Sequence, residues 1–331
     1  MSNIQAWQYS NAQGGLESAL SLNKSASAPT SASLSKGQIL VKVIAAAVNP
    51  ADYKLPEIGI ISKIFITKPA TPGLDFCGRV VATHHSVTEL QQGQLVYGAL
   101  SPLSKHGTLC QFIIAPVSEC VLLPDGVDPC EAAAVGTAGL TAYQALLAGK
   151  TSQGSKVLIN GGSGGTGTFG IQLAKLLGSH VTTTCSTANV DLCRRLGADT
   201  VLDYKQVDLI SELEKSDDRF DIVVDNVGTP GLYETSPRFM KPNGVFLQVH
   251  FNPTAIRRSL LPKFLGGGSR QHRIVGLKTK TEDLEQLGRW VQEGKLKPVI
   301  ETYDWKDVPK AYTKLKSGRT VGKLVIRVPD S

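Results

Sequence analysis

The sequence predicts an α/β protein that combines a doubly wound parallel sheet with a second, antiparallel barrel-like unit. Between residues 156 and 278, short apolar runs alternate with helical segments, which is the pattern of βαβ units in a parallel sheet. Before residue 125, short strand-like runs are separated by Gly, Pro, Asn and Ser, which is typical of a compact antiparallel unit. A chain of 331 residues suits two such domains.

The expected elements follow from these patterns. In the first part, strands are expected at residues 39–46, 78–83, 94–99, 108–114 and 120–123. The Ser/Ala-rich segment 21–36 is expected to be an exposed loop, and a helix at 131–148 leads into the parallel sheet. That sheet is expected to contain strands at 157–159, 181–185, 200–202, 220–225, 244–249 and 273–278. Its helices are expected at 190–196, 207–215 and 232–240, and Gly266–Gly268 is expected in a loop. A helix at 282–291 and a strand at 323–328 return to the first unit.

The segment KVLINGGSGGTGTFGIQLAKLLG, residues 156–178, carries the most informative motif. It places G-x-G-x-x-G between an apolar strand and a helix, which is the context that this motif requires. The glycines allow a tight turn and a close approach to a pyrophosphate, and the helix N-terminus offers free N–H groups. The residues expected to bind a dinucleotide here are Gly162, Ser163, Gly164, Gly165, Thr166 and Gly167.

The end of the next strand indicates which nucleotide binds. An NAD site usually places Asp or Glu there to bind the ribose hydroxyls. This chain has Cys-Ser-Thr at residues 185–187, and the first acidic residue after this strand is Asp191. No carboxylate would repel a 2′-phosphate, and Ser186 can donate to one. Arg194 and Arg195 either add positive charge or are solvated on a helix. The sequence therefore predicts NADPH as the cofactor.

Composition excludes several other classes. The net charge is +7, but the basic residues are scattered and form no stripe with aromatics, so nucleic-acid binding is not indicated. No apolar run approaches the ~20 residues of a membrane span, and the first residues do not resemble a secretory signal. Six cysteines without a C-x-x-C pair are expected to be reduced thiols in the cytoplasm.

Five further segments carry a resemblance: AVNPADYK at residues 47–54, PGLDFCG at 72–78, TAGLTA at 137–142, DNVG at 225–228 and VGKLV at 321–325. With the glycine motif, they make nearly the whole chain similar to the medium-chain dehydrogenase/reductase superfamily. The chain resembles most the zinc-independent quinone oxidoreductases, alkenal and enone reductases, and fungal trans-acting enoyl reductases. The resemblance implies a GroES-like catalytic domain at 1–126, a Rossmann domain at 127–275 and a C-terminal return at 276–331.

Departures from the zinc alcohol dehydrogenases imply that no metal is bound. Those enzymes carry a ligand Cys where this chain has Pro50, and Gly-His-Glu where it has residues 73–75, Gly-Leu-Asp. Zinc needs three or four ligands within tetrahedral reach, which His84 and His85 alone cannot supply. Without a Lewis acid a simple ketone is harder to reduce. A conjugated acceptor is easier, because ordinary hydrogen-bond donors suffice for the enolate.

The resemblance also implies roles in the active site. Asn49 and Asp52 would border the nicotinamide pocket. Lys54 would stabilise the enolate or relay a proton, unless it only forms a surface salt bridge. Thr137 would contact the carboxamide or the substrate oxygen, unless its hydroxyl only caps or packs a helix. Tyr53 replaces the Trp of the family motif and either takes part in catalysis or packs.

Other residues are expected near the cofactor. Tyr204 matches a family tyrosine beside the 2′-phosphate, and Lys323 returns near the cofactor cleft unless it is solvated on an edge strand. Ligands of open α/β sheets lie at the carboxyl ends of strands. On this ground Val227, Gly228 and Val249 are also expected to bind the cofactor.

The predicted function is an NADPH-dependent, metal-free reductase of an enone, enal or enoyl thioester, or of a quinone. A narrower alternative is a carrier-bound polyketide substrate. Two other classes stay open: a cofactor-binding protein with a structural or regulatory role, and a related fold used for non-redox cyclisation. The sequence does not name the acceptor, the proton donor or the oligomeric state, although a homodimer is usual in this branch.

Overall fold

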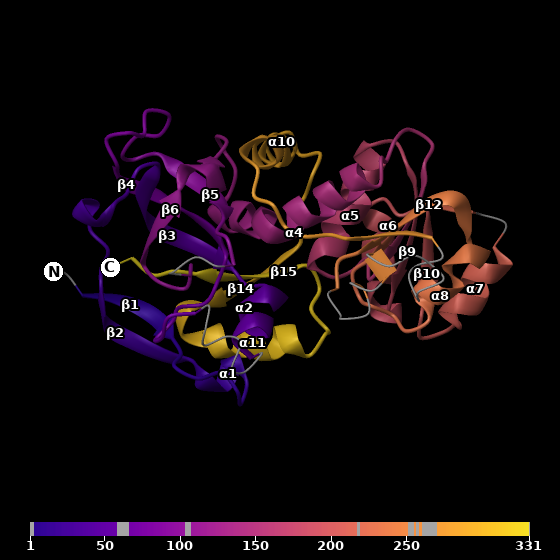
Figure 1. Cartoon of the computed structure of the whole chain (residues 1–331), viewed down its shortest axis with the longest axis horizontal. Helices are drawn as coiled ribbons and strands as arrows, with labels where there is room; N and C mark the ends of the chain where they lie inside the picture. Colours follow the sequence, from indigo (N-terminus) through magenta and orange to yellow (C-terminus); the bar gives the residue numbers. More distant parts are fainter. Residues whose placement is uncertain are drawn as a thin grey trace. The chain divides into compact units, whose positions relative to one another are not determined.

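The chain folds into two compact units, Met1–Leu140 with Lys278–Ser331, and Thr141–Leu277. The computed structural model describes residues 3–57, 66–102, 107–216, 219–250, 255, 258–259 and 270–330. Figure 1 shows the last segment of the chain, in yellow, lying among the first elements, in indigo. The predicted fold class, a parallel α/β sheet with a separate barrel-like unit, is confirmed.

The first unit is built on a seven-stranded sheet in the order β14-β15-β3-β4-β5-β7, with β6 paired to β3. Its strands are β3 (Gln38–Ala47), β4 (Asp75–Thr83), β5 (Leu95–Ala99), β6 (Phe112–Pro116), β7 (Cys120–Leu122), β14 (Ile300–Asp304) and β15 (Lys323–Arg327). The long, apolar β3 organises this sheet. Its start pairs with β6 and its end with β15, while β4 runs along its other edge. The C-terminal strand is therefore part of the barrel.

A separate antiparallel pair joins β1 (Asn3–Gln8) to β2 (Ser21–Ser27). The expectation of an exposed loop over residues 21–36 is therefore wrong for 21–27. In β2 only Ala26 is buried, so the segment lacks the alternation of apolar residues by which a strand is recognised. Beyond it, η1 (Ser31–Ser33) is a single exposed turn.

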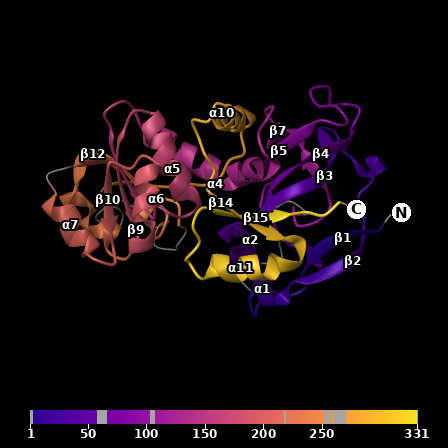
Figure 2. The same ribbon diagram turned by 180° about the vertical axis from the view of Figure 1, so that it is seen from behind.

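Helices complete the described part of the first unit. They are α1 (Leu16–Ala19), α2 (Pro50–Glu57), α10 (Thr281–Gln292) and α11 (Val308–Lys316), and α4 (Pro129–Ala148) begins in this unit. Lys316 on α11 forms ion pairs with Glu17 of α1 at 2.8 Å and with Glu57 of α2 at 2.9 Å. Figure 2 shows α11 beside α1 from behind. Neither α2 nor α11 was expected from the sequence.

The second unit contains a six-stranded, wholly parallel sheet in the order β10-β9-β8-β11-β12-β13. Its strands are β8 (Lys156–Asn160), β9 (His180–Cys185), β10 (Thr200–Asp203), β11 (Phe220–Asp225), β12 (Met240–Gln248) and β13 (Gln271–Ile274). The helices are α5 (Gly165–Leu176), η3 (Thr187–Asn189), α6 (Val190–Arg195), α7 (Leu209–Lys215), α8 (Leu232–Thr235) and η4 (Ser236–Arg238). Strand order reverses at β8, which creates a crevice at the carboxyl ends of the strands.

Several expected boundaries are wrong. The helix expected at 232–240 ends at Thr235, and β12 starts at Met240, because Pro237 cannot continue the helical hydrogen bonds. The last strand of the parallel sheet lies at 271–274 and not at 273–278. The strand expected at 108–114 starts only at Phe112, because the Leu109 carbonyl accepts the backbone N–H of Trp7 in β1. Strands β1 and β14 were not expected, and Gly266–Gly268 lies outside the described residues.

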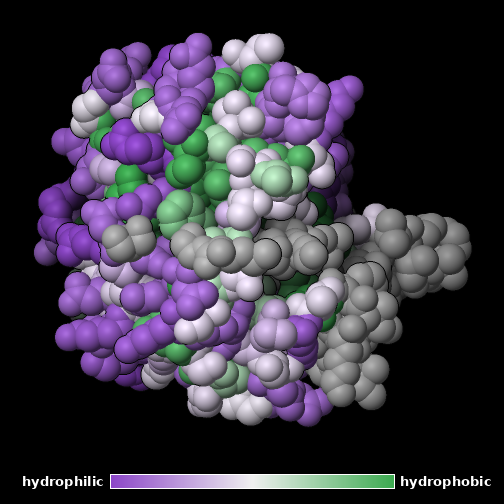
Figure 3. All heavy atoms as spheres, turned by 90° about the vertical axis from the view of Figure 1, so that its left-hand side faces the viewer, coloured by the Kyte–Doolittle hydropathy of each residue, from purple (hydrophilic) through white to green (hydrophobic). Residues whose placement is uncertain are grey.

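The surface and the cysteines add little to the choice of function. Figure 3 shows a face that is mainly hydrophilic, with apolar side chains gathered in its upper half. None of the helices in the described part of the chain has the length and apolar character of a membrane span. All six cysteines lie in described segments and none forms a disulfide there. Burial raises the pKa of the Cys110 and Cys120 thiols to about 12.

Candidate active site

Asp75, at the first position of β4, is the centre of a buried polar network in the first unit. Its side chain is 0% exposed, and both of its oxygens accept two hydrogen bonds. Oδ1 accepts the Thr137 backbone N–H at 2.7 Å and the Thr137 hydroxyl at 2.5 Å. Oδ2 accepts Asn49 Nδ2 at 2.9 Å and Lys323 Nζ at 3.1 Å. The carboxylate is thus satisfied entirely within the protein.

Lys323, at the start of β15, supplies the positive charge of this network. Its side chain is 4% exposed. Besides Asp75, the ammonium donates to the Val48 carbonyl at 3.1 Å and to Asn49 Oδ1 at 2.5 Å. An ammonium has three donors, and all three are used. Lys323 is therefore neither solvated nor on an edge strand, and in this arrangement it has no donor left for a ligand.

The start of α2 fixes Asn49 and Asp52. Pro50 opens the helix, where its missing N–H and fixed φ suit the first helical position. Asp52 Oδ2 accepts the Asn49 backbone N–H at 2.8 Å, which is one half of a capping box. The Asn49 side chain is therefore free to turn inward to Asp75 and Lys323. Tyr312 also donates its hydroxyl to Asp52 Oδ2 at 3.1 Å.

Thr137 reaches the network from α4. A Cβ on the preceding Gly136 would lie 2.6 Å from Asp75 Oδ1, so only glycine allows α4 to come this close. Because its hydroxyl proton points at Asp75, Thr137 keeps only lone pairs for another group. It can accept a hydrogen bond from a ligand, such as one from a carboxamide NH₂. It cannot at the same time donate to a substrate oxygen.

Lys54 and Tyr53 lie on α2 outside this network. Burial lowers the pKa of Lys54, and no hydrogen bond or ion pair joins its ammonium to another described residue, so the alternative of a salt bridge with Asp52 is not observed. The Tyr53 ring packs on the core of the first unit, with Lys316 Nζ 5.5 Å from its centroid. Burial and the charge of Glu57 raise the pKa of Tyr53. These contacts favour the packing role for Tyr53.

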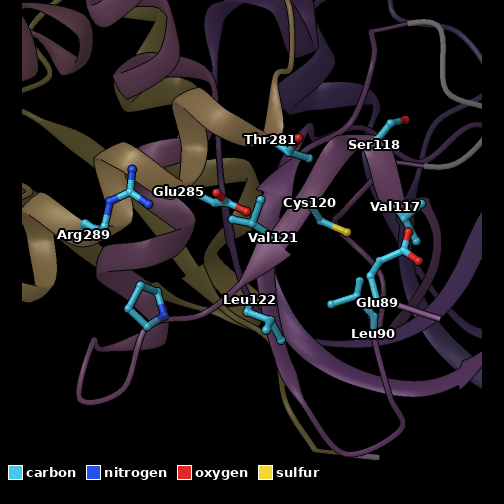
Figure 4. Close-up of a pocket in the computed structure, with 11 residues that line it drawn as sticks. Glu89, Leu90, Val117, Ser118, Cys120, Val121, Leu122, Thr281, Glu285 and Arg289 are labelled. Carbon is cyan, nitrogen blue, oxygen red and sulfur yellow. The ribbon is translucent and has the colours of Figure 1, made fainter. Parts of the chain in front are cut away.

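A cavity of about 650 Å³ lies elsewhere on the first unit. Figure 4 shows Val121 and Leu122 of β7 on its floor, with Glu285 and Arg289 of α10 on one side and Glu89 on the other. None of the residues expected to be catalytic lines it. Nothing in the described residues indicates what this cavity would hold.

In the second unit, the glycine turn between β8 and α5 needs glycine for different reasons at different positions. Gly161 has φ of +83°, which L side chains rarely adopt. A Cβ at Gly162 would lie 2.0 Å from Thr183 Oγ1, and one at Gly167 would lie 2.1 Å from the Gly161 carbonyl. A Cβ at Gly164 would have only the Gly161 carbonyl nearby, at 3.6 Å. No packing inside the chain requires glycine at 164, as expected if a ligand approaches there.

The residues expected near the 2′-phosphate lie just after the ends of three adjacent strands of this unit, β8, β9 and β10. Asn189 Nδ2 donates to Ser163 Oγ and to Ser186 Oγ, each at 3.2 Å, and so joins the glycine turn to the end of β9. Tyr204 follows β10 and is 49% exposed, with Lys205 Nζ 5.7 Å from its ring centroid. These side chains present hydroxyl groups and one cation at neighbouring strand ends.

On the other side of β8, Asp225 orders the end of β11. It is 2% exposed, and its Oδ1 accepts Asn160 Nδ2 at 2.7 Å, Val227 N at 3.1 Å and Gly228 N at 2.9 Å. The side chain of Val227 is thereby left half exposed at the strand end. Val249 donates its N–H to the Asp225 carbonyl at 2.9 Å.

The second unit fits a dinucleotide. The glycine turn leads into the N-terminus of α5, whose first N–H groups have no partner within the helix and attract a phosphate. The hydroxyls beside it suit the ribose and its phosphate.

For a metal ion at Asp75 in the first unit the fit is poor, because the four acceptor positions of this carboxylate are taken. Within the described segments, no group of three His, Cys, Asp or Glu residues could hold a metal ion.

Comparisons with known proteins agree with this architecture. Residues 35–125 match the alcohol dehydrogenase GroES-like domain, and residues 196–326 match the zinc-binding dehydrogenase family. The trans-enoyl reductase pgmF of Aspergillus terreus is 46% identical over 100% of this chain and 98% of its own. A zinc-type alcohol dehydrogenase-like protein of Schizosaccharomyces pombe is 37% identical over 97% of this chain and 96% of its own. The solved quinone oxidoreductase of Coxiella burnetii is 30% identical with a TM-score of 0.87, covering 98% of this chain and 99% of its own.

Fold and site together define an oxidoreductase that uses a nicotinamide cofactor and acts on small molecules. The chain belongs to the medium-chain dehydrogenase/reductase superfamily.

Sequence reasoning named the segments of the site but missed four of its residues. Asp75 and Asp225 lie inside the recognised segments 72–78 and 225–228, where an acid at a strand end was an available signal. Asn189 and Tyr312 carried no such signal. The partner of Tyr312 is remote in the sequence. The contacts of Asn189 depend on the direction of its side chain.

We predict that Lys323→Met destabilises the protein by about 3–5 kcal/mol, because it leaves the buried Asp75 charge uncompensated. The double variant with Asp75→Asn is expected to recover part of this loss. Urea unfolding followed by tryptophan fluorescence measures both. A free energy of unfolding for Lys323→Met within about 1 kcal/mol of the parent would contradict the ion pair.

A second prediction separates the glycines. Gly167→Ala is expected to lower the melting temperature, because its methyl group meets backbone atoms. Gly164→Ala is expected to leave the melting temperature unchanged and to weaken binding of the nicotinamide dinucleotide, because its methyl group has room in the chain but not beside a pyrophosphate. Thermal unfolding and fluorescence titration measure these effects. Unaltered dinucleotide affinity in Gly164→Ala would show that the phosphates bind elsewhere.

Proposed function

We propose that this protein is an NADPH-dependent, metal-free reductase that delivers hydride to an activated C=C bond or to a quinone. The acceptor would be an enone, an enal or an enoyl thioester. The similarity to a trans-enoyl reductase and to a quinone oxidoreductase supports both acceptor types. The higher identity to the trans-enoyl reductase favours the enoyl group, including one presented on a carrier.

One observation carries the metal-free part of the proposal. Asp75 stands where zinc enzymes of the family carry a Glu, and here its charge is balanced by Lys323 at 3.1 Å. Its lone pairs already accept four hydrogen bonds. A carboxylate in this state has nothing to offer a metal ion. Without a Lewis acid, a conjugated acceptor suits the site better than a simple ketone.

The residues of the chain then have distinct tasks. The glycine turn and the N-terminus of α5 bind the phosphates, while Ser186 and Tyr204 contact the 2′-phosphate. Thr137 accepts a hydrogen bond from the carboxamide and so orients the ring. When bound, the reduced nicotinamide supplies the hydride. Lys54 donates to the oxygen on which enolate charge develops, and partial burial strengthens this interaction.

The test is oxidation of NADPH, followed at its absorbance band, with a panel of enones, enoyl thioesters, quinones and simple ketones. We expect turnover with conjugated acceptors and quinones, little with simple ketones, and full activity in a strong chelator. Loss of activity together with one tightly bound zinc per chain would overturn the metal-free assignment. Tight NADPH binding without oxidation of any acceptor would favour a structural, regulatory or cyclising protein.

Cofactor choice gives a prediction for Ser186. Ser186→Asp is expected to weaken NADPH binding by at least about tenfold and to improve NADH binding, because like charges ~4 Å apart repel by up to about 4 kcal/mol near a surface. The neutral variant Ser186→Asn is the control for the change in size. Binding titrations with both nucleotides measure this preference. NADH binding as tight as NADPH binding in the parent would refute it.

A further prediction concerns Lys54. Lys54→Met is expected to lower turnover on an enone by on the order of 10²-fold, because one donor to the developing oxyanion is lost. NADPH affinity should stay nearly constant, since the phosphates bind in the second unit. Lys24→Met, at an exposed position of β2, is the control. Parent-like turnover in Lys54→Met would assign the role to solvent or to Tyr53.

A further inference from the structure

Two buried carboxyl groups in the first unit share one buried ammonium. Asp52 is 5% exposed and Asp75 is 0% exposed, while the side chain of Lys323 is 4% exposed. Asp75 pairs directly with Lys323, whereas no ion pair joins Asp52 to any described residue. If both carboxyl groups were ionised, the cluster would carry a net charge of −1 away from water, which is costly. The cluster is neutral only when one of them holds a proton.

The hydrogen bonds identify the carboxyl group and the oxygen that hold this proton. On Asp75 every acceptor position already faces a donor. On Asp52, Oδ2 accepts from Asn49 N and Tyr312 Oη. Asp52 Oδ1 is buried and has no hydrogen-bond partner among the described residues. The proton therefore belongs on Asp52 Oδ1, the one oxygen that no donor faces.

The groups around Asp52 support this assignment. Burial is the largest influence and, with the charge of Asp75 on β4, raises the pKa of Asp52 to about 7 against the effects of its hydrogen bonds and of Lys323 on β15. Among the described residues, the other titratable groups that interact with Asp52 are phenols: Tyr312 on α11, Tyr9 after β1, and Tyr53 on α2 itself. All three have raised pKa values, so they stay neutral and add no charge.

A small cavity adjoins this group. Its volume is about 50 Å³, more than the ~15 Å³ that one water needs. The residues that line it include Asp52, Tyr9, Leu55, Thr71 and Ser101. The cavity therefore has room for a water beside Asp52, while the buried Oδ1 itself has almost no contact with solvent.

We infer that Asp52 is held as a neutral acid in the folded protein and that its bound proton positions the first turn of α2 for the reaction. Asn49 contacts both carboxyl groups, and Lys54 lies two residues beyond Asp52. Once ionised, Asp52 competes with Asp75 for Lys323 and pulls on this turn. Asp52 thus acts through Asn49 and Lys54, as a positioning residue. The kinetic consequence rests on the proposed function, whereas the protonation state does not.

The protonation state can be read directly in the protein without cofactor. Difference infrared spectra should show a protonated carboxyl band at pH 6 that disappears as the pH rises through about 7 and is absent in Asp52→Asn. Glu57→Gln, which removes another carboxyl group from α2, should keep the band. A spectrum without such a band in the parent at pH 6 would overturn the inference.

Stability gives a second reading that needs no activity. The pKa of Asp52 is raised on folding, so its contribution to stability is complete below about pH 4 and is lost as the pH rises to about 7. Over this window the folding equilibrium constant of the parent should fall by up to about tenfold per pH unit relative to that of Asp52→Asn. A constant ratio of the two across the window would contradict a neutral Asp52.

Kinetics test the positioning role. Turnover of the parent should decline above about pH 7, and the turnover of Asp52→Asn, whose side chain is neutral at every pH, should not change over this range. Tyr312→Phe removes a donor that favours the ionised form, so its decline should move to higher pH by on the order of one unit.

Three outcomes are distinguishable. A folded Asp52→Asn that binds NADPH but is inactive at every pH would overturn the positioning role and require an acid at this site. A parent-like decline in both Asp52→Asn and Tyr312→Phe would assign the decline to another group. No turnover by the parent with any acceptor would refute the proposed function, while the infrared and stability results would still decide the protonation of Asp52.

Discussion

The ion pair between Asp75 and Lys323 is the constraint on which the first unit depends. The two residues are 248 positions apart, and each is almost without solvent contact. Burying either charge without the other is costly in free energy, so β4 and β15 must both be in place before either charge can be buried. Asn49 and Thr137 complete the pair and bring in the start of α2 and a turn of α4. Four segments are thus held in register by one carboxylate.

This constraint accounts for the return of the last segment of the chain to the first unit. The segment after Lys278 returns to the first unit, where β15 pairs with the end of β3 and α11 packs on α1. Tyr97 of β5 donates to the Leu284 carbonyl at 2.6 Å and ties α10 to the same barrel. The second unit differs, because its strands are joined in sequence by helices and its site is built at successive strand ends. Its parts are local, whereas those of the first unit are not.

That difference decides what the sequence could reveal. The glycine turn, the βαβ pattern and the class of fold could be predicted, because strand, turn and helix are adjacent in the chain. The segments of the first unit could be recognised, but the partners of Asp75 could not, because no local pattern shows that Lys323 faces it. For the same reason Lys323 was expected at the cofactor, although the structure gives all its donors to the protein. The strand β2 was missed because its mostly exposed residues give no alternation.

The direction of single protons decides which groups of this site can still bind a ligand. Asp75 takes the hydroxyl proton of Thr137, so this threonine can only accept from a ligand. Lys323 donates its three protons inside the network, so its positive charge holds the fold together and none of its donors is left for a ligand. Lys54 was expected to be catalytic, and no hydrogen bond or ion pair joins its ammonium to another described residue. In the proposed function, such a site orients the cofactor through acceptors and leaves the Lys54 ammonium to donate to the substrate. Such a division suits an acceptor whose charge appears on oxygen only as the bond forms, because the donor is needed in the transition state more than in the ground state.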